Sequence, residues 1–154
     1  MEYLISNEES ARVNALLAGQ VDYAHDITPT TARTHADGGR MTVTRMPNST
    51  MQSFAMKVDR PPFDNRLVRE AVSHAVDRDA VIDGALFGFG EPIGSHYSRQ
   101  DRAWVDLADR YPHDPERARA LLAEAGYAEG FDVTLRLPPR PYARRSGEVI
   151  AEKA

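Results

Sequence analysis

Cysteine is missing from all 154 residues of the chain. Its absence excludes a thiol nucleophile, a thiolate zinc site and any disulfide. The cellular compartment stays open, because secreted proteins of sufficient size fold without disulfides.

Long apolar segments are missing as well. No run approaches the ~20 apolar residues that a membrane-spanning helix needs. The opening residues MEYLIS lack the basic and apolar regions of a signal peptide. We therefore expect an exported form of the protein to carry its leader upstream of Met1.

Lysine is scarce: of the 19 basic residues only Lys57 and Lys153 are lysines, and the rest are arginines. We interpret this bias as genomic base composition. The net charge of −4 and the pI near 5.7 argue against a nucleic-acid partner or an anionic membrane surface.

Helix signals recur along the chain. Ser6 and Glu9 are spaced as a capping box, Thr28-Pro29 as a cap followed by proline at the first helical position, and Asp64 as an N-cap. Asp114-Pro115 is likewise an N-cap residue followed by proline at the first helical position, and Gly126 is expected to end that helix. The predicted helices follow these caps, with two more over about 80–86 and from 140 onward.

Short strands are predicted between the helices, and a long loop over 88–113. The strand segments are rich in β-formers or alternate apolar and polar residues; they are residues 3–5, 21–24, 41–45, 50–56 and 131–137. The order of elements predicts an α/β fold. Because both chain ends fall inside expected elements, we expect a piece of a larger protein.

Catalytic chemistry is poorly supported. Histidine stands near aspartate at His25, His35 and His113, but without metal-ligand spacing on a predicted helix. No serine lies in a nucleophile elbow, and no paired carboxylates or phosphate loop occur. The sequence predicts no enzyme, no metal and no cofactor. Arg140, Arg144 and Arg145 are interpreted as a solvated face, and Trp104 as a packing residue ahead of a ligand contact.

Four strings together resemble the family 5 extracellular solute-binding proteins of bacterial ABC importers, the peptide, dipeptide and nickel binders. Each string is weak alone, but their order and spacing fit the family along nearly the whole chain. They are residues 14–24 (NALLAGQVDYA), 61–78 (PPFDNRLVREAVSHAVDR), 88–92 (GFGEP) and 114–127 (DPERARALLAEAGY).

The resemblance implies a two-lobed periplasmic-binding-protein type II fold that closes on a ligand. Residues 1–45 would end lobe one, 46–57 would form the hinge strands, and 58–154 would be the first half of lobe two. The family usually has Asn where this chain has Met56, so that position departs from the pattern.

The resemblance also implies partners and a place of action. These are a small solute, with peptide as the expected cargo, and the membrane permease of an ABC importer, in the periplasm or at the cell surface. The membrane itself would be reached only through a lipid anchor outside this chain. Residues near the cleft are expected to contact the ligand, and they are Thr50, Ser53, Phe54, His96 and Tyr97.

Two other classes stay open. Similar lobes can be fused to DNA-binding domains, so the chain could be the ligand-sensing part of a transcriptional regulator. A small stand-alone enzyme is the third class. A signal peptide with a lipidated cysteine upstream would favour transport, and a helix-turn-helix upstream would favour regulation.

Overall fold

The computed structural model describes residues 4–44 and 51–153, and it divides the chain into two compact units, Met1–Met46 and Pro47–Ala154. The predicted lobe boundary near residue 45 lies beside this division, and the predicted hinge over 46–57 is only partly within the described residues. The assignment of these parts to lobes and hinge stays a prediction.

The first unit contains two helices, α1 (Glu9–Leu17) and α2 (Pro29–Asp37). For α2 the predicted start is confirmed, because Thr28 is the N-cap, Pro29 opens the helix and Gly38 ends it. The predicted capping box of α1 is wrong. Glu8 takes the N-cap position without a side-chain cap bond, and the Ser6 hydroxyl donates to the Glu8 carbonyl at 3.3 Å instead.

The carboxylate of Glu9 joins the two helices of this unit. It accepts hydrogen bonds from the Thr28 backbone N–H at 3.0 Å and from the Thr28 hydroxyl at 2.9 Å. Burial opposes its ionisation, but the hydrogen bonds from Thr31 and Thr28 and the charge of Arg12 outweigh it and lower the pKa of Glu9. The guanidinium of Arg12 adds donations to the carbonyls of Ser6 and Asp26, both at 2.9 Å.

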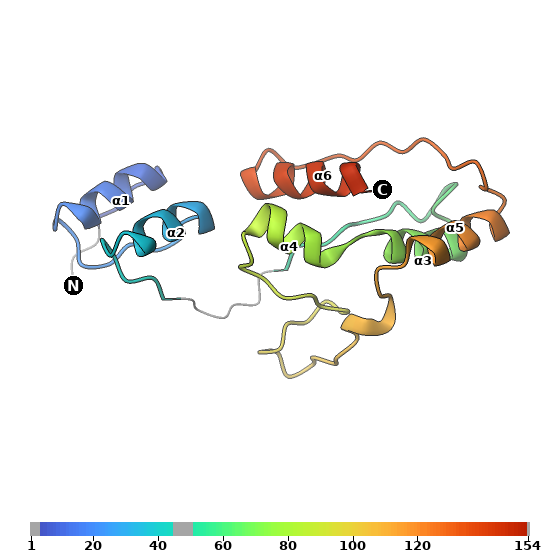
Figure 1. The fold of residues 1–154 in the computed structure, drawn as a ribbon, viewed down its shortest axis with the longest axis horizontal. Helices are drawn as coiled ribbons and strands as arrows, with labels where there is room; N and C mark the ends of the chain where they lie inside the picture. Colours follow the sequence, from blue (N-terminus) through green and yellow to red (C-terminus); the bar gives the residue numbers. More distant parts are fainter. Residues whose placement is uncertain (1–3, 45–50, 154) are drawn as a thin grey trace. The chain divides into compact units, whose positions relative to one another are not determined.

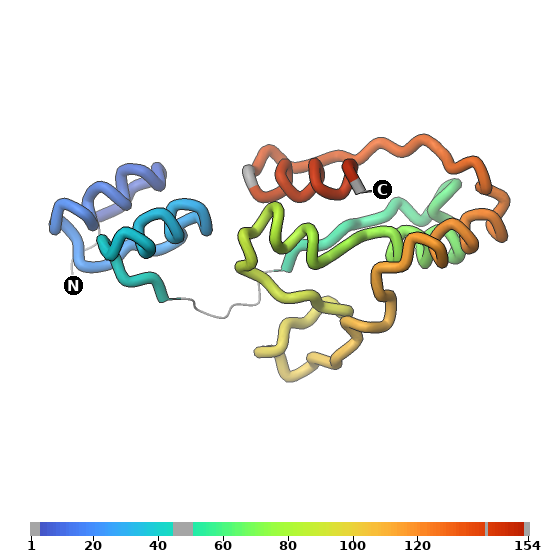
Figure 2. The backbone as a smooth tube through the Cα atoms, viewed as in Figure 1, coloured from blue at the N-terminus to red at the C-terminus, as the bar shows by residue number. Residues whose placement is uncertain are grey.

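The second unit contains two helix pairs, drawn in Figures 1 and 2. One pair is α3 (Arg66–Ala75) with α5 (Pro115–Glu124), and the other is α4 (Arg78–Leu86) with α6 (Pro141–Lys153). The α3–α5 pair buries Ala71, Ala118 and Leu121 in one cluster, and Leu67, Ala75 and Leu122 pack against it. The apolar side of α3 that carries Leu67, Ala71 and Ala75 is therefore packed against a helix.

Side-chain caps start three of these helices. Asn65 caps α3 by accepting from Leu67 N at 2.9 Å, one residue later than the predicted Asp64. Asp77 caps α4, and Asp114 caps α5 as predicted, each accepting at 2.9 Å from a backbone N–H three residues on.

The α4–α6 pair is in contact near both of its ends. A Cβ built on Gly84 would stand 3.1 Å from Cγ2 of Val149. Near the other end of the interface the guanidinium of Arg145 lies over the ring of Phe87. Since 84 meets 149 and 87 meets 145, the two helices run antiparallel. The start of α6 therefore lies beside the end of α4, as Figure 1 shows.

The loop over 88–113 contains only the short 3₁₀ helix η1 (Ala108–Arg110), so the predicted long loop is largely confirmed. The C-terminal end of this loop is held by hydrogen bonds at the junction of α3 and α4. His74 Nδ1 lies 2.9 Å from the Pro112 carbonyl oxygen, and Arg78 donates to the Tyr111 carbonyl at 2.8 Å. His113 Nδ1 lies 3.5 Å from Asp77 Oδ2.

The predicted strands are wrong for the described residues, because 4–44 and 51–153 contain helices but no strand. The α/β prediction is thus not met by these residues taken alone. A strand needs a neighbouring backbone to complete its hydrogen bonds, and residues 51–57 and 131–137 have none beside them in register. The alternating apolar side chains of Val133, Leu135 and Leu137 are accordingly exposed.

Among the described residues, none of the helices combines the length and the apolar character that crossing a membrane requires.

We expect Glu9→Gln to lower the free energy of unfolding by about 1 kcal/mol at pH 7, the net value of a typical hydrogen bond. The pKa of Glu9 is lowered in the fold, so the ionised carboxylate stabilises above its ordinary pKa of 4.5, and this contribution disappears as the pH falls through the folded pKa. Denaturant unfolding at several pH values measures this. Glu8→Gln is the control, and a deficit that persists unchanged in acid would contradict the prediction.

We expect Ser146→Ala to leave stability unchanged or raise it by about 1 kcal/mol. The Ser146 hydroxyl is buried and has no hydrogen-bond partner among the described residues. Ser73→Ala is the matched control, because the Ser73 hydroxyl donates to the Arg69 carbonyl at 2.9 Å, so its removal should raise stability less than Ser146→Ala does. Thermal unfolding compares the two variants. A clear loss of stability in Ser146→Ala would show that the Ser146 hydroxyl does have a hydrogen-bond partner, and it would contradict the prediction.

Candidate functional site

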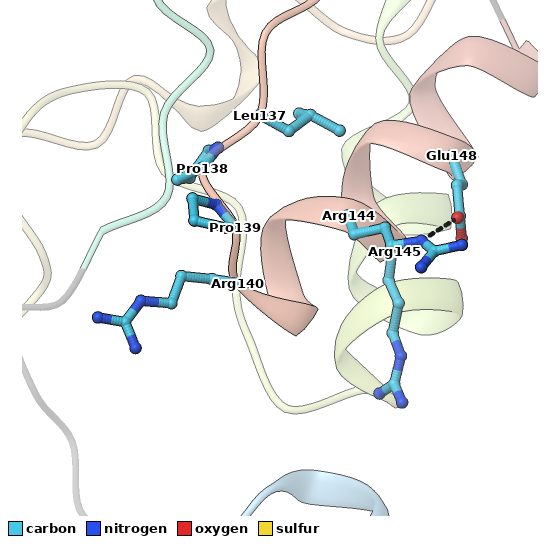
Figure 3. A pocket seen from close by; sticks show the side chains of 7 residues that line it. All are labelled: Leu137, Pro138, Pro139, Arg140, Arg144, Arg145 and Glu148. Carbon is cyan, nitrogen blue, oxygen red and sulfur yellow. Dashed lines mark hydrogen bonds and ion pairs between the residues drawn. The ribbon is translucent and has the colours of Figure 1, made fainter.

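An open pocket of about 730 Å³ lies where the segment after Leu135 enters α6 (Figure 3). Seven residues line it, and they are Leu137, Pro138, Pro139, Arg140, Arg144, Arg145 and Glu148. Three of the seven are arginines and one is an acid, so the lining is basic in a chain that is acidic overall.

The rim of this pocket, which we call the arginine pocket, is shaped by two prolines and a glycine. Proline fixes its own backbone and restricts the preceding residue to extended conformations, so Pro138 and Pro139 carry the chain stiffly into the helix. Leu137 packs onto Gly147 of α6, and Cδ2 of Leu137 would be 2.9 Å from a Cβ built there. The rim can approach α6 this closely because position 147 has no side chain.

The three arginines differ in their partners. Arg144 is paired with Glu148 one turn along α6, with Nε 2.9 Å from Oε1. Arg145 has its guanidinium 5.4 Å from the centre of the Phe87 ring. The Arg140 side chain is exposed and makes no hydrogen bond or ion pair with any residue that the structure describes. Figure 3 shows it extending away from the Arg144–Glu148 pair.

An exposed arginine beside a helix start is chemically suited to an anion. The first N–H groups of a helix lack partners inside the helix and carry partial positive charge. A guanidinium matches the planar geometry of a carboxylate or phosphate with two parallel hydrogen bonds. The arrangement can hold an acidic group, but it offers no nucleophile.

The residues predicted to contact a ligand lie elsewhere. Thr50 is outside the described residues, while Ser53 is exposed and Phe54 half-buried in the irregular segment before α3. His96 and Tyr97 are exposed on the 88–113 loop, where the Ser95 hydroxyl turns the chain by accepting from Tyr97 N at 3.3 Å. None of the four described residues lines the arginine pocket.

Trp104 is held inside its own loop. Its side chain is half-buried, and the guanidinium of Arg99 stands 5.1 Å from the ring centre. The same loop is closed by Ser98, whose hydroxyl donates to Asp101 at 2.8 Å. These contacts agree with a packing role for Trp104.

Sequence reasoning missed the arginine pocket by treating Arg140, Arg144 and Arg145 as a solvated face. All three side chains are exposed, so the structure agrees with that interpretation of them. The signal that could have found the site is the Pro138-Pro139 pair directly before an arginine-rich helix start. Among the described residues, no three His, Asp or Glu side chains are grouped so that they could hold a metal ion.

The family model for bacterial extracellular solute-binding proteins, family 5 (middle part), matches residues 1–153. The chain belongs to this family. The family consists of binding proteins and not of enzymes, and the resemblance noted in the sequence is confirmed.

Individual relatives bind chemically different solutes. The glutathione-binding protein GsiB of Pectobacterium atrosepticum is 30% identical over 131 residues, which cover 83% of this chain and 25% of the relative. Heme-binding protein A of Haemophilus influenzae is 36% identical over 102 residues, covering 63% of this chain and 19% of the relative.

The chain is also similar to a solved structure, in both fold and sequence. The periplasmic binding protein AgaA of A. tumefaciens R10, in complex with agropinic acid, matches with a TM-score of 0.70 and 32% identity. The match covers 98% of this chain and 31% of AgaA. The chain thus corresponds to a part of a periplasmic binding protein, and it spans between a fifth and a third of these relatives' lengths.

Proposed function

We propose that this family 5 chain belongs to the solute-binding component of an ABC importer. In this proposal the protein captures an extracytoplasmic solute between two lobes and delivers it to the membrane permease, in the periplasm or at the cell surface. The observation that carries the proposal is the family match over residues 1–153.

In this proposal the two lobes move as rigid bodies and close around the bound solute. A solute that touches both lobes stabilises the closed state by the difference in its affinity for the two states. The division of the chain into two units after Met46 supports a hinge at residues 46–57. On this proposal the first unit ends lobe one, and α3 to α6 belong to lobe two.

The solute carries an acidic group that the arginine pocket binds. Arg140 supports this, because its side chain is exposed at the helix start and makes no hydrogen bond or ion pair with the described residues. The ligands named for the relatives, glutathione, heme and agropinic acid, share carboxylate groups although they differ in everything else. A peptide, the cargo expected from the sequence, has such a group at its carboxyl end.

The 88–113 loop and the segment before α3 supply further contacts. Thr50, Ser53, Phe54, His96 and Tyr97 are proposed to line the cleft. Ser53, His96 and Tyr97 are exposed, so their side chains are accessible to a ligand.

We expect Arg140→Gln to weaken solute binding by about tenfold or more, because a hydrogen bond to a charged group contributes about 1.5–3 kcal/mol. Calorimetry on the complete protein with glutathione, heme and agropinic acid measures the loss. Arg136→Gln is the matched control, since Arg136 is exposed on the same segment but does not line the pocket. Equal affinities in the wild type and Arg140→Gln would refute an acid-binding role for the pocket.

We expect Tyr97→Ala to weaken the same binding by several-fold, because a ring that covers a ligand loses its buried area when truncated. Val105→Ala serves as the control, since Val105 is an exposed apolar residue of the same loop. If calorimetry finds identical affinities for Tyr97→Ala and the wild type, the loop does not contact the solute.

A further inference from the structure

Phe87 has a backbone conformation that its side chain disfavours. It follows the last residue of α4 with φ 54° and ψ 37°, in the left-handed region. Glycine is the usual residue at this position, and a bulky residue there is strained. Among the described residues, Asp26 is the other non-glycine residue with positive φ, and aspartate tolerates this conformation well.

The ring of Phe87 has a specific neighbour. It is half-buried, and the guanidinium carbon of Arg145 lies 5.4 Å from its centre, within the range of a cation–π contact. Arg145 lines the arginine pocket, and Figure 3 shows its side chain running from α6 toward the neighbouring helix. The antiparallel packing of α4 and α6 brings the strained residue and the pocket together.

We propose that Phe87 is a positioning residue that holds Arg145 at the edge of the arginine pocket for an acidic group of the solute. The proposal rests on the proposed function. Strained backbone persists where the surroundings fix it, and it clusters at ligand sites. Here the strain places an aromatic ring beneath a pocket arginine, which glycine could not do.

A ring suits this task better than a carboxylate would. Arginine has many rotamers, and ordering it before the ligand arrives removes that cost from binding. An aromatic face attracts the guanidinium without adding a negative charge that would compete with an acidic ligand. Arg144 of the same pocket is paired with the acid Glu148, with Nε 2.9 Å from Oε1.

The test compares three variants of the complete protein, Phe87→Leu, Phe87→Gly and Phe87→Tyr, by calorimetry with agropinic acid and glutathione and by denaturant unfolding. We expect Leu and Gly to weaken binding about two- to fivefold, the worth of an exposed cation–π contact, and Tyr to keep wild-type affinity. Phe87→Gly relieves the strain of the left-handed backbone but also removes a half-buried ring, so its stability should change little while its affinity falls.

In Phe87→Gly the affinity therefore falls without a matching fall in stability, which a purely structural role would not produce. Unchanged affinity in Phe87→Leu and Phe87→Gly, or a loss of affinity that parallels a loss of stability, overturns the proposal.

A double-mutant cycle with Arg145→Gln separates this proposal from the proposed function. We expect Arg145→Gln to weaken binding and Phe87→Leu to add nothing in that background. If Arg145→Gln weakens binding but the Phe87 variants do not, only the positioning role fails. If neither Arg140→Gln nor Arg145→Gln changes affinity, the acid-binding pocket of the proposed function fails, and the role of Phe87 fails with it.

Discussion

The close approach of α4 and α6 is the constraint on which the arginine pocket depends. Gly84 of α4 leaves room for the side chain of Val149 of α6, and the small residues Ala85, Ala143 and Ser146 of the two helices are buried. Small residues leave little freedom to adjust, because a closely packed interior transmits any added volume as a shift of the helix. The position of α6 in turn fixes Leu137 on Gly147 and the arginines around the pocket.

Helix ends could be predicted from the sequence, but strands could not. Thr28 and Asp114 cap helices as predicted, and Gly19 ends α1 with φ 69°, since capping needs only neighbours along the chain. Residues 131–137 alternate as a strand should, but alternation supplies no hydrogen-bonding partner. The relatives are several times longer than this chain, and pairing between distant segments is invisible in a local pattern.

The site shows the same difference between local and distant information. Arg140, Arg144 and Arg145 could be named from the sequence, and composition made a solvated face the simplest interpretation of them. The three arginines differ in their contacts, which only the structure shows. Arg144 pairs with Glu148 on α6, and Arg145 lies over the ring of Phe87 because α6 packs on α4. The ring of Phe87 could not have been paired with Arg145 from the sequence, because 58 positions separate them along the chain.

The fastening of the 88–113 loop has an evolutionary consequence. His74 and Arg78 reach main-chain oxygens of Pro112 and Tyr111, and a carbonyl oxygen is present whatever side chain the loop carries. The helices thus hold the loop by atoms that mutation does not remove. As long as His74 and Arg78 are kept, side chains earlier in the loop, such as His96 and Tyr97, can change without removing these two contacts.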